Sequence, residues 1–105
     1  MAHFCVLFGL LQHVRGGGEL GRHFYEPPNG AKYLCKQNSF NDFVDVGRFL
    51  VQERQLTSTD LLACLGASAG GLLIGASINQ APELFKAAVL DVPFVDVMGT
   101  MVDGS

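Results

Sequence analysis

The motif G-A-S-A-G at residues 66–70 constrains the fold of this chain more than any other feature. The apolar run 61–65 precedes it directly, and the apolar, glycine-containing segment 71–76 follows. The run predicts a buried strand and the segment opens a helix, so the motif lies at a strand-to-helix corner. A serine on such a corner, here Ser68, points outward as a nucleophile, and the next backbone N–H, that of Ala69, is free to hold an oxyanion. The pattern predicts a serine hydrolase.

The composition indicates one small globular domain and argues against nucleic acid as a partner. Its 105 residues are 49% hydrophobic and 16% charged, which is typical of a folded domain. The net charge of -3 provides no basic stripe to neutralise phosphates, so we expect no nucleic acid as the main partner.

The cysteines give no sign of a disulfide framework or a metal site. The chain has three cysteines, an odd number, and no C-x-x-C spacing: they are Cys5, Cys35 and Cys64. We therefore expect no metal and no cofactor, and a reducing compartment.

The apolar N-terminus, residues 1–11, raises the alternative of an export signal. It lacks a basic first region and a small-residue cleavage site, and it is too short to span a bilayer. A buried strand is the preferred interpretation, and we expect no membrane partner.

The hydrophobic pattern along the chain alternates between strand and helix. Ser39 and Asp42 resemble a capping box at the start of a helix. The apolar residues of this helix fall on one face at helical spacing, and its charged residues Asp45, Arg48 and Glu53 fall elsewhere. Alternating strands and helices indicate an α/β fold with a parallel sheet. The expected elements are a strand over 4–14, a loop over 15–21, a helix over 39–55, a loop over 57–60, a strand over 61–66, a helix over 68–79 and a strand over 86–92.

A second motif favours a competing function. Residues 16–21 satisfy G-x-G-x-x-G after an apolar segment, which is typical of a dinucleotide-binding turn, and Asp42 follows about 20 residues later. Such a turn must open a helix that meets the pyrophosphate. Pro27 and Pro28 follow too soon for a helix of useful length, so we expect a tight backbone loop and no nucleotide.

Four ordered blocks give the chain a family resemblance. It resembles the prolyl oligopeptidase family of serine peptidases, most closely its oligopeptidase B branch, from residue 13 to about residue 103. The blocks are HVRGGGELGR at 13–22, NSFNDF at 38–43, GASAGGLL at 66–73, and PELFKAAV at 82–89 followed by VPFVDV at 92–97.

The resemblance implies a partial α/β-hydrolase fold and a set of site residues. Ser68 would be the nucleophile, the Ala69 N–H one oxyanion donor, and Gly66, Gly70 and Gly71 part of the nucleophile elbow. Members of this family combine the catalytic domain with a β-propeller and cleave short peptides through an acyl-enzyme. The oligopeptidase B branch cleaves after Arg or Lys, and a cytoplasmic location is implied.

The remaining catalytic groups are expected outside the chain. In α/β-hydrolases the order is Ser, then Asp, then His, whereas His3, His13 and His23 all precede Ser68. Asp91 and Asp96 follow the serine too closely to be the orienting carboxylate. The family's second oxyanion donor, a tyrosine, and an acidic residue of the pocket for basic side chains are also expected outside residues 1–105.

We therefore expect residues 1–105 to be the central fragment of a peptidase catalytic domain, and the isolated chain to be inactive. The alternative is a truncated, non-catalytic interaction module that binds a partner through its open sheet.

Overall fold

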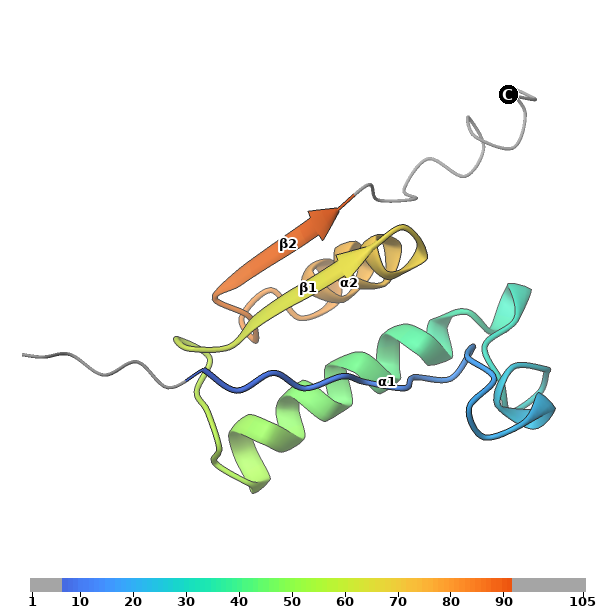
Figure 1. The fold of residues 1–105 in the computed structure, drawn as a ribbon, viewed down its shortest axis with the longest axis horizontal. Helices are drawn as coiled ribbons and strands as arrows, with labels where there is room; N and C mark the ends of the chain where they lie inside the picture. The colour runs from blue at the N-terminus through green and yellow to red at the C-terminus, as the bar shows by residue number, and fades with distance from the viewer. Residues whose placement is uncertain (1–6, 92–105) are drawn as a thin grey trace, which may run out of the picture.

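The computed structural model describes residues 7–91, and Figure 1 shows a short sheet with two helices on one side of it. None of the helices in this part of the chain is both long enough and apolar enough to cross a membrane. In chain order the elements are the 3-10 turns η1 (Arg22–Phe24) and η2 (Tyr33–Cys35), the helix α1 (Gln37–Arg48) with the π-helical extension η3 (Phe49–Glu53), the strand β1 (Ala63–Ala67), the helix α2 (Ala69–Gln80) and the strand β2 (Ala87–Asp91).

The sheet has the parallel α/β arrangement that the sequence predicts. β1 and β2 form a 2-stranded parallel sheet whose register runs from Ala63 opposite Ala87 to Ala67 opposite Asp91. α2 connects the two strands and packs against both, and α1 packs on α2 (Figure 1). The fold class is therefore α/β with a parallel sheet. The predicted strand over 86–92 is confirmed as far as residue 91, because residue 92 lies outside the described residues.

The core lies between α1 and the turn that follows α2. Val44 on α1 is fully buried against Ala81 and Leu84, and Phe43 stacks on Phe85 with ring centroids 5.6 Å apart. The apolar stripe of α1 thus faces the rest of the molecule, as its helical spacing predicts. The charged residues predicted to lie off this stripe, Asp45, Arg48 and Glu53, are exposed.

The strand predicted over residues 4–14 is wrong for the described part, residues 7–14. This segment pairs with no strand, and the side chains of Leu7, Phe8 and Leu11 are 92%, 89% and 83% exposed. It runs alongside α1 (Figure 1), where residues 10–14 line a shallow hollow with α1. An apolar run becomes a strand only where a neighbouring strand accepts its backbone hydrogen bonds. β1 and β2 each keep one free edge, but within residues 7–91 neither edge is paired with this segment.

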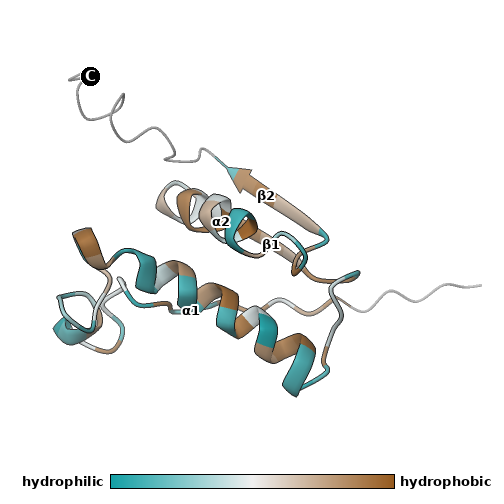
Figure 2. Cartoon of the chain, turned by 180° about the vertical axis from the view of Figure 1, so that it is seen from behind, coloured by the Kyte–Doolittle hydropathy of each residue, from teal (hydrophilic) through white to brown (hydrophobic). Residues whose placement is uncertain are grey.

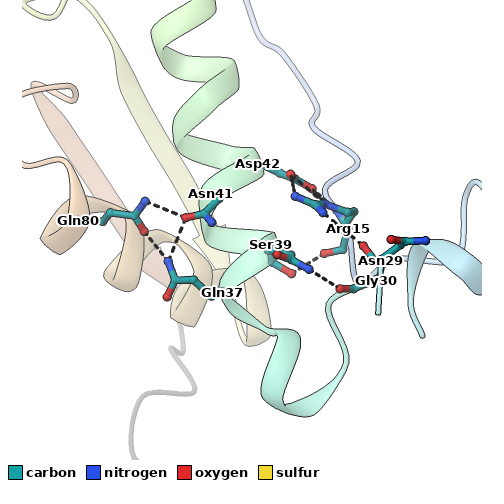
Figure 3. Close-up of polar contacts among 9 residues, drawn as sticks. Arg15, Asn29, Gly30, Gln37, Ser39, Asn41, Asp42 and Gln80 are labelled. Carbon is teal, nitrogen blue, oxygen red and sulfur yellow. Dashed lines mark hydrogen bonds and ion pairs between the residues drawn. The ribbon is translucent and has the colours of Figure 1, made fainter. Parts of the chain in front are cut away.

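The predicted capping box at Ser39 and Asp42 is also wrong. α1 begins at Gln37 after Lys36, and no side chain caps it. Ser39, only 1% exposed, donates its hydroxyl to the carbonyl of Arg15, and Asp42 accepts hydrogen bonds from Arg15 (Figure 3). Both side chains bond to Arg15, which is distant in sequence, and not to the first amides of α1.

One face of the sheet has no cover among the described residues. Side chains alternate along each strand, so buried Cys64 faces α2, while Leu65 and Val89 are 72% and 57% exposed. Figure 2 shows α2 and α1 on the same side of the sheet. Within residues 7–91 only the α2 face of the sheet is covered.

Candidate active site

Ser68 forms the whole corner between β1 and α2. β1 ends at Ala67 and α2 begins at Ala69, so Ser68 alone turns the chain. Its φ is 52° and its ψ is -117°, a backbone conformation that L-residues rarely adopt. A strained residue of this kind persists only where its surroundings hold it, and such residues cluster at active sites.

The Ser68 hydroxyl is not used to cap the helix. A serine that precedes a helix usually has an extended backbone and accepts a hydrogen bond from an amide of the first turn. Here the positive φ is accompanied by no side-chain capping bond, and the residue is exposed. The corner therefore presents the hydroxyl on the surface at the N-terminus of α2.

Close contact between β1 and α2 depends on Gly66. A Cβ atom built on Gly66 would lie 2.2 Å from the Gly70 carbonyl oxygen and 2.6 Å from Cγ1 of Ile74. Only glycine lets helix and strand approach to this distance. Gly70 differs, because a Cβ there would meet no described atom within 4 Å. Gly71 is buried in the first turn of α2.

The backbone after Ser68 leaves the first amides of α2 available for an oxyanion. The Ser68 N–H donates to the Asp91 carbonyl at 3.0 Å, and the Ser68 carbonyl accepts from Gly71 and Leu72 at 2.9 and 3.3 Å. The N–H of Ala69, the first residue of α2, has no acceptor within residues 7–91. This amide lies at the positive end of the helix dipole, where an anion is stabilised.

No histidine of the described residues contacts Ser68. His13 pairs with Glu19 at 3.3 Å in the glycine-rich loop, and the backbone N–H of Glu19 together with His13 lowers the pKa of that carboxyl. His23 lies in η1 and is exposed. His3 and Asp96 lie outside the described residues. Within residues 7–91 the corner thus combines a hydroxyl with an oxyanion donor, without a general base.

The glycine-rich loop lacks the features of a nucleotide site. The helix that follows it, η1, has 3 residues, too few to present an N-terminus to a pyrophosphate. Asp42, which has the sequence spacing of a ribose-binding acid, accepts hydrogen bonds from the Arg15 backbone N–H at 2.9 Å and from Nε and Nη2 at 2.9 and 2.7 Å. These hydrogen bonds give the loop a structural role and engage that acid, so that it is not free for a ribose.

Arg15 and Asp42 stabilise each other's charged forms. The hydrogen bonds to Asp42 raise the pKa of Arg15. Burial acts to raise the pKa of Asp42, but the bonds from Arg15 outweigh it and keep that pKa below its ordinary value. Arg15 also donates to the Asn29 carbonyl at 3.3 Å, and Asn38 donates to the Gly30 carbonyl at 2.7 Å (Figure 3). The loop is thereby joined to the first turns of α1.

A ring of three amide side chains joins α1 to the end of α2. Gln37 donates to Gln80 at 2.9 Å and to Asn41 at 3.1 Å, and Gln80 donates to Asn41 at 3.0 Å (Figure 3). Together with the core around Val44, this ring holds α2 in place behind the Ser68 corner. Sequence reasoning missed the ring, because Gln37 and Gln80 are 43 residues apart.

The comparison with known proteins finds one family over most of the chain. Residues 8–105 match the prolyl oligopeptidase family. The chain is 48% identical over 93 residues to a dipeptidyl aminopeptidase BI of Pseudoxanthomonas mexicana and 49% identical over 92 residues to a protease 2 of Moraxella lacunata. It is 43% identical over 89 residues to a prolyl endopeptidase of Dictyostelium discoideum.

The aligned region covers most of this chain and little of each relative. It takes in 89%, 88% and 85% of the chain but 12%, 13% and 11% of the three relatives, in the same order.

Proposed function

Because this chain belongs to the prolyl oligopeptidase family of serine peptidases, we propose that Ser68 is the nucleophile of an enzyme that hydrolyses peptide bonds. The observation that carries the proposal is the backbone of Ser68, whose φ of 52° exposes an uncapped hydroxyl at the N-terminus of α2. The Ala69 N–H is the proposed oxyanion donor, and Gly66, Gly70 and Gly71 complete the proposed elbow.

The proposed mechanism is acyl transfer in two halves. Ser68 Oγ attacks the substrate carbonyl while a general base takes its proton, and the Ala69 N–H holds the oxygen that becomes negative. The leaving amine takes the proton as the C–N bond breaks, which leaves an acyl-enzyme. Water then repeats the sequence and releases the acid. The residues of this chain supply the nucleophile and the oxyanion donor.

We further propose that residues 1–105 are the central part of the catalytic domain and that the isolated chain is inactive. The described residues provide no base beside Ser68, and the relatives are several times longer than the aligned region. A serine without a base keeps an ordinary hydroxyl and reacts slowly. A cytoplasmic location also belongs to this proposal.

Cleavage of short peptides after Arg or Lys is the finer part of the proposal. It is supported by the resemblance to the oligopeptidase B branch and by the similarity to protease 2. The other relatives carry the names dipeptidyl aminopeptidase and prolyl endopeptidase, so specificity is the part to be measured.

The first prediction concerns hydrolysis by the intact polypeptide that carries these residues. Peptides with Arg, Lys, Pro or Ala before the scissile bond are compared by kcat/KM. We expect the Arg and Lys peptides to be cleaved fastest, and Ser68→Ala to lower kcat by at least about 10³-fold, because the nucleophile is lost.

Ser58→Ala, in the loop before β1, is the matched control and should retain activity. Cleavage that survives Ser68→Ala would contradict the assignment of the nucleophile. A preference for Pro or for N-terminal dipeptides would overturn only the specificity.

A non-catalytic module is the second candidate, favoured by the exposed apolar side chains of Leu65 and Val89 on the open face of the sheet. Such faces bind other chains or aggregate. It becomes the leading account if the intact polypeptide shows no Ser68-dependent hydrolysis.

A further inference from the structure

The elements that build the Ser68 corner carry a single formal charge. β1 and α2 contain no acidic or basic side chain, and β2 contains Asp91 alone. The other titratable group on these elements is the Cys64 thiol, whose pKa is raised by burial, so it is uncharged at neutral pH. Asp91 is therefore the one local source of formal charge that β1, α2 and β2 place around Ser68.

Asp91 lies directly beside the corner. It is the last residue of β2 and stands opposite Ala67 in the register, one residue before Ser68. Its carbonyl accepts the Ser68 N–H at 3.0 Å, which fixes the two residues side by side. This bond also occupies the amide of Ser68, which leaves the first amides of α2, beginning with that of Ala69, for the oxyanion.

The carboxylate of Asp91 is exposed and unpaired within residues 7–91. It makes no hydrogen bond or ion pair there, in contrast to Asp42, whose carboxylate is held by Arg15. A structural role of the Asp42 kind is thus absent for the Asp91 side chain in this part of the chain. Within these residues no partner neutralises its negative charge.

We propose that the Asp91 carboxylate stabilises the positive charge that the general base acquires when it takes the proton of Ser68. This inference rests on the proposed function. Asp91 would act at a distance, as a residue that tunes the base without touching the substrate.

The size of the effect follows from the geometry. A base that reaches Ser68 Oγ lies about 3 Å from it. Asp91 and the corner lie on paired strands, which are about 5 Å apart, so we take its carboxylate to lie within about 10 Å of such a base. At that distance a partly screened charge shifts a titration by about 0.3–1 pH unit. A negative charge favours the protonated base, so its removal should move the titration to lower pH. The partial positive charge at the N-terminus of α2 stays the same in all variants.

The test measures how fast Ser68 is modified by diisopropyl fluorophosphate, an uncharged reagent, between pH 4 and pH 9 in the intact polypeptide. In this reaction Oγ forms a bond to phosphorus, the P–F bond breaks, fluoride leaves and the serine proton passes to the base. The rate therefore falls at acid pH with the titration of the base. Tandem mass spectrometry confirms that the adduct is on Ser68.

In Asp91→Asn we expect the pH at which the rate falls on the acid side to be lower by about 0.3–1 pH unit. The shift should be smaller at 1 M salt, where exposed charges are screened. Asp91→Glu keeps the charge and should keep the wild-type profile. Asp60→Asn is the matched control, because Asp60 precedes β1 at its far end, about 15 Å from Ser68 by the rise of the strand.

An unchanged acid limb in Asp91→Asn would overturn the inference, as would an equal shift in Asp60→Asn. A lower rate at every pH with the same limb would also contradict it, because that is the sign of a structural role. Wild-type protein that is not modified at Ser68 would instead contradict the proposed function itself, and the inference would fall with it.

Discussion

Ser68 has a strained backbone conformation, and Gly66 permits the close helix–strand contact that holds it. Ser68 holds a φ of 52° that a residue with a side chain adopts at a cost of about 1–3 kcal/mol. Gly66 has no side chain and lets α2 pack directly on β1, which over-determines the position of Ser68. The strain at the serine is thus sustained by the contact that the glycine permits.

The two glycines of the motif should respond differently to alanine. In Gly66→Ala the new Cβ meets the Gly70 carbonyl oxygen at 2.2 Å, so we expect a loss of about 1–3 kcal/mol in the free energy of unfolding, measured in urea. Gly70→Ala is the matched control. Its Cβ meets no described atom within 4 Å and it lies in a helix, so it should stabilise the chain by up to about 1 kcal/mol. Equal losses in both variants would contradict the packing described for Gly66.

At the scale of elements, polar side chains determine where α1 lies. Its buried stripe packs on the turn after α2, while Arg15 and Asp42 join its first turns to the glycine-rich loop. The amide ring of Gln37, Asn41 and Gln80 joins the same end of α1 to the end of α2. The position of α2, and with it the Ser68 corner, is thereby supported from behind.

The contribution of the Arg15–Asp42 pair should depend on pH. The pKa of Asp42 is lower in the folded chain than in the unfolded chain, so its contribution is present above the unfolded pKa, about 3.9, and is lost as pH falls through the folded pKa. Asp42→Asn should lower the free energy of unfolding by about 1–2 kcal/mol at pH 7, because the pair is partly exposed.

The loss caused by Asp42→Asn should shrink below pH 4, as measured by urea unfolding at several pH values. Asp45→Asn, an exposed position on the same helix, should change the stability little at either pH. A loss in Asp42→Asn that stays constant from pH 7 to pH 2.5 would rule out the ion pair as its source.

Elements whose signals are local were predictable, and contacts between distant residues were not. The strand before Ser68 and the helix after it were predicted to within two residues, because hydrophobic period and glycine position are read in a short window. The capping box failed because Arg15, 27 residues from Asp42, satisfies that carboxylate instead. The N-terminal strand failed because a strand needs a partner that its own sequence does not specify.

At the scale of the whole molecule, the described residues leave one face of the sheet open. A sheet of 2 strands is covered on one face, and the apolar side chains of Leu65 and Val89 are exposed on the other. The sequence motif predicted where the serine would stand. The bond from the Ser68 amide to the Asp91 carbonyl required the structure, because Asp91 is 23 residues further along the chain, and the value of the Ser68 φ required it too.

The reactivity of Ser68 toward diisopropyl fluorophosphate at pH 7.5 tests the central claim most directly. The rate is compared between the intact polypeptide and the isolated chain of residues 1–105, with the modified residue located by tandem mass spectrometry. We predict modification at Ser68 in the intact polypeptide, at least about 10³-fold faster than in the isolated chain, because we propose that the base comes from outside residues 1–105. Modification of another serine, or equal slow rates in both, would contradict the assignment of Ser68 as a peptidase nucleophile.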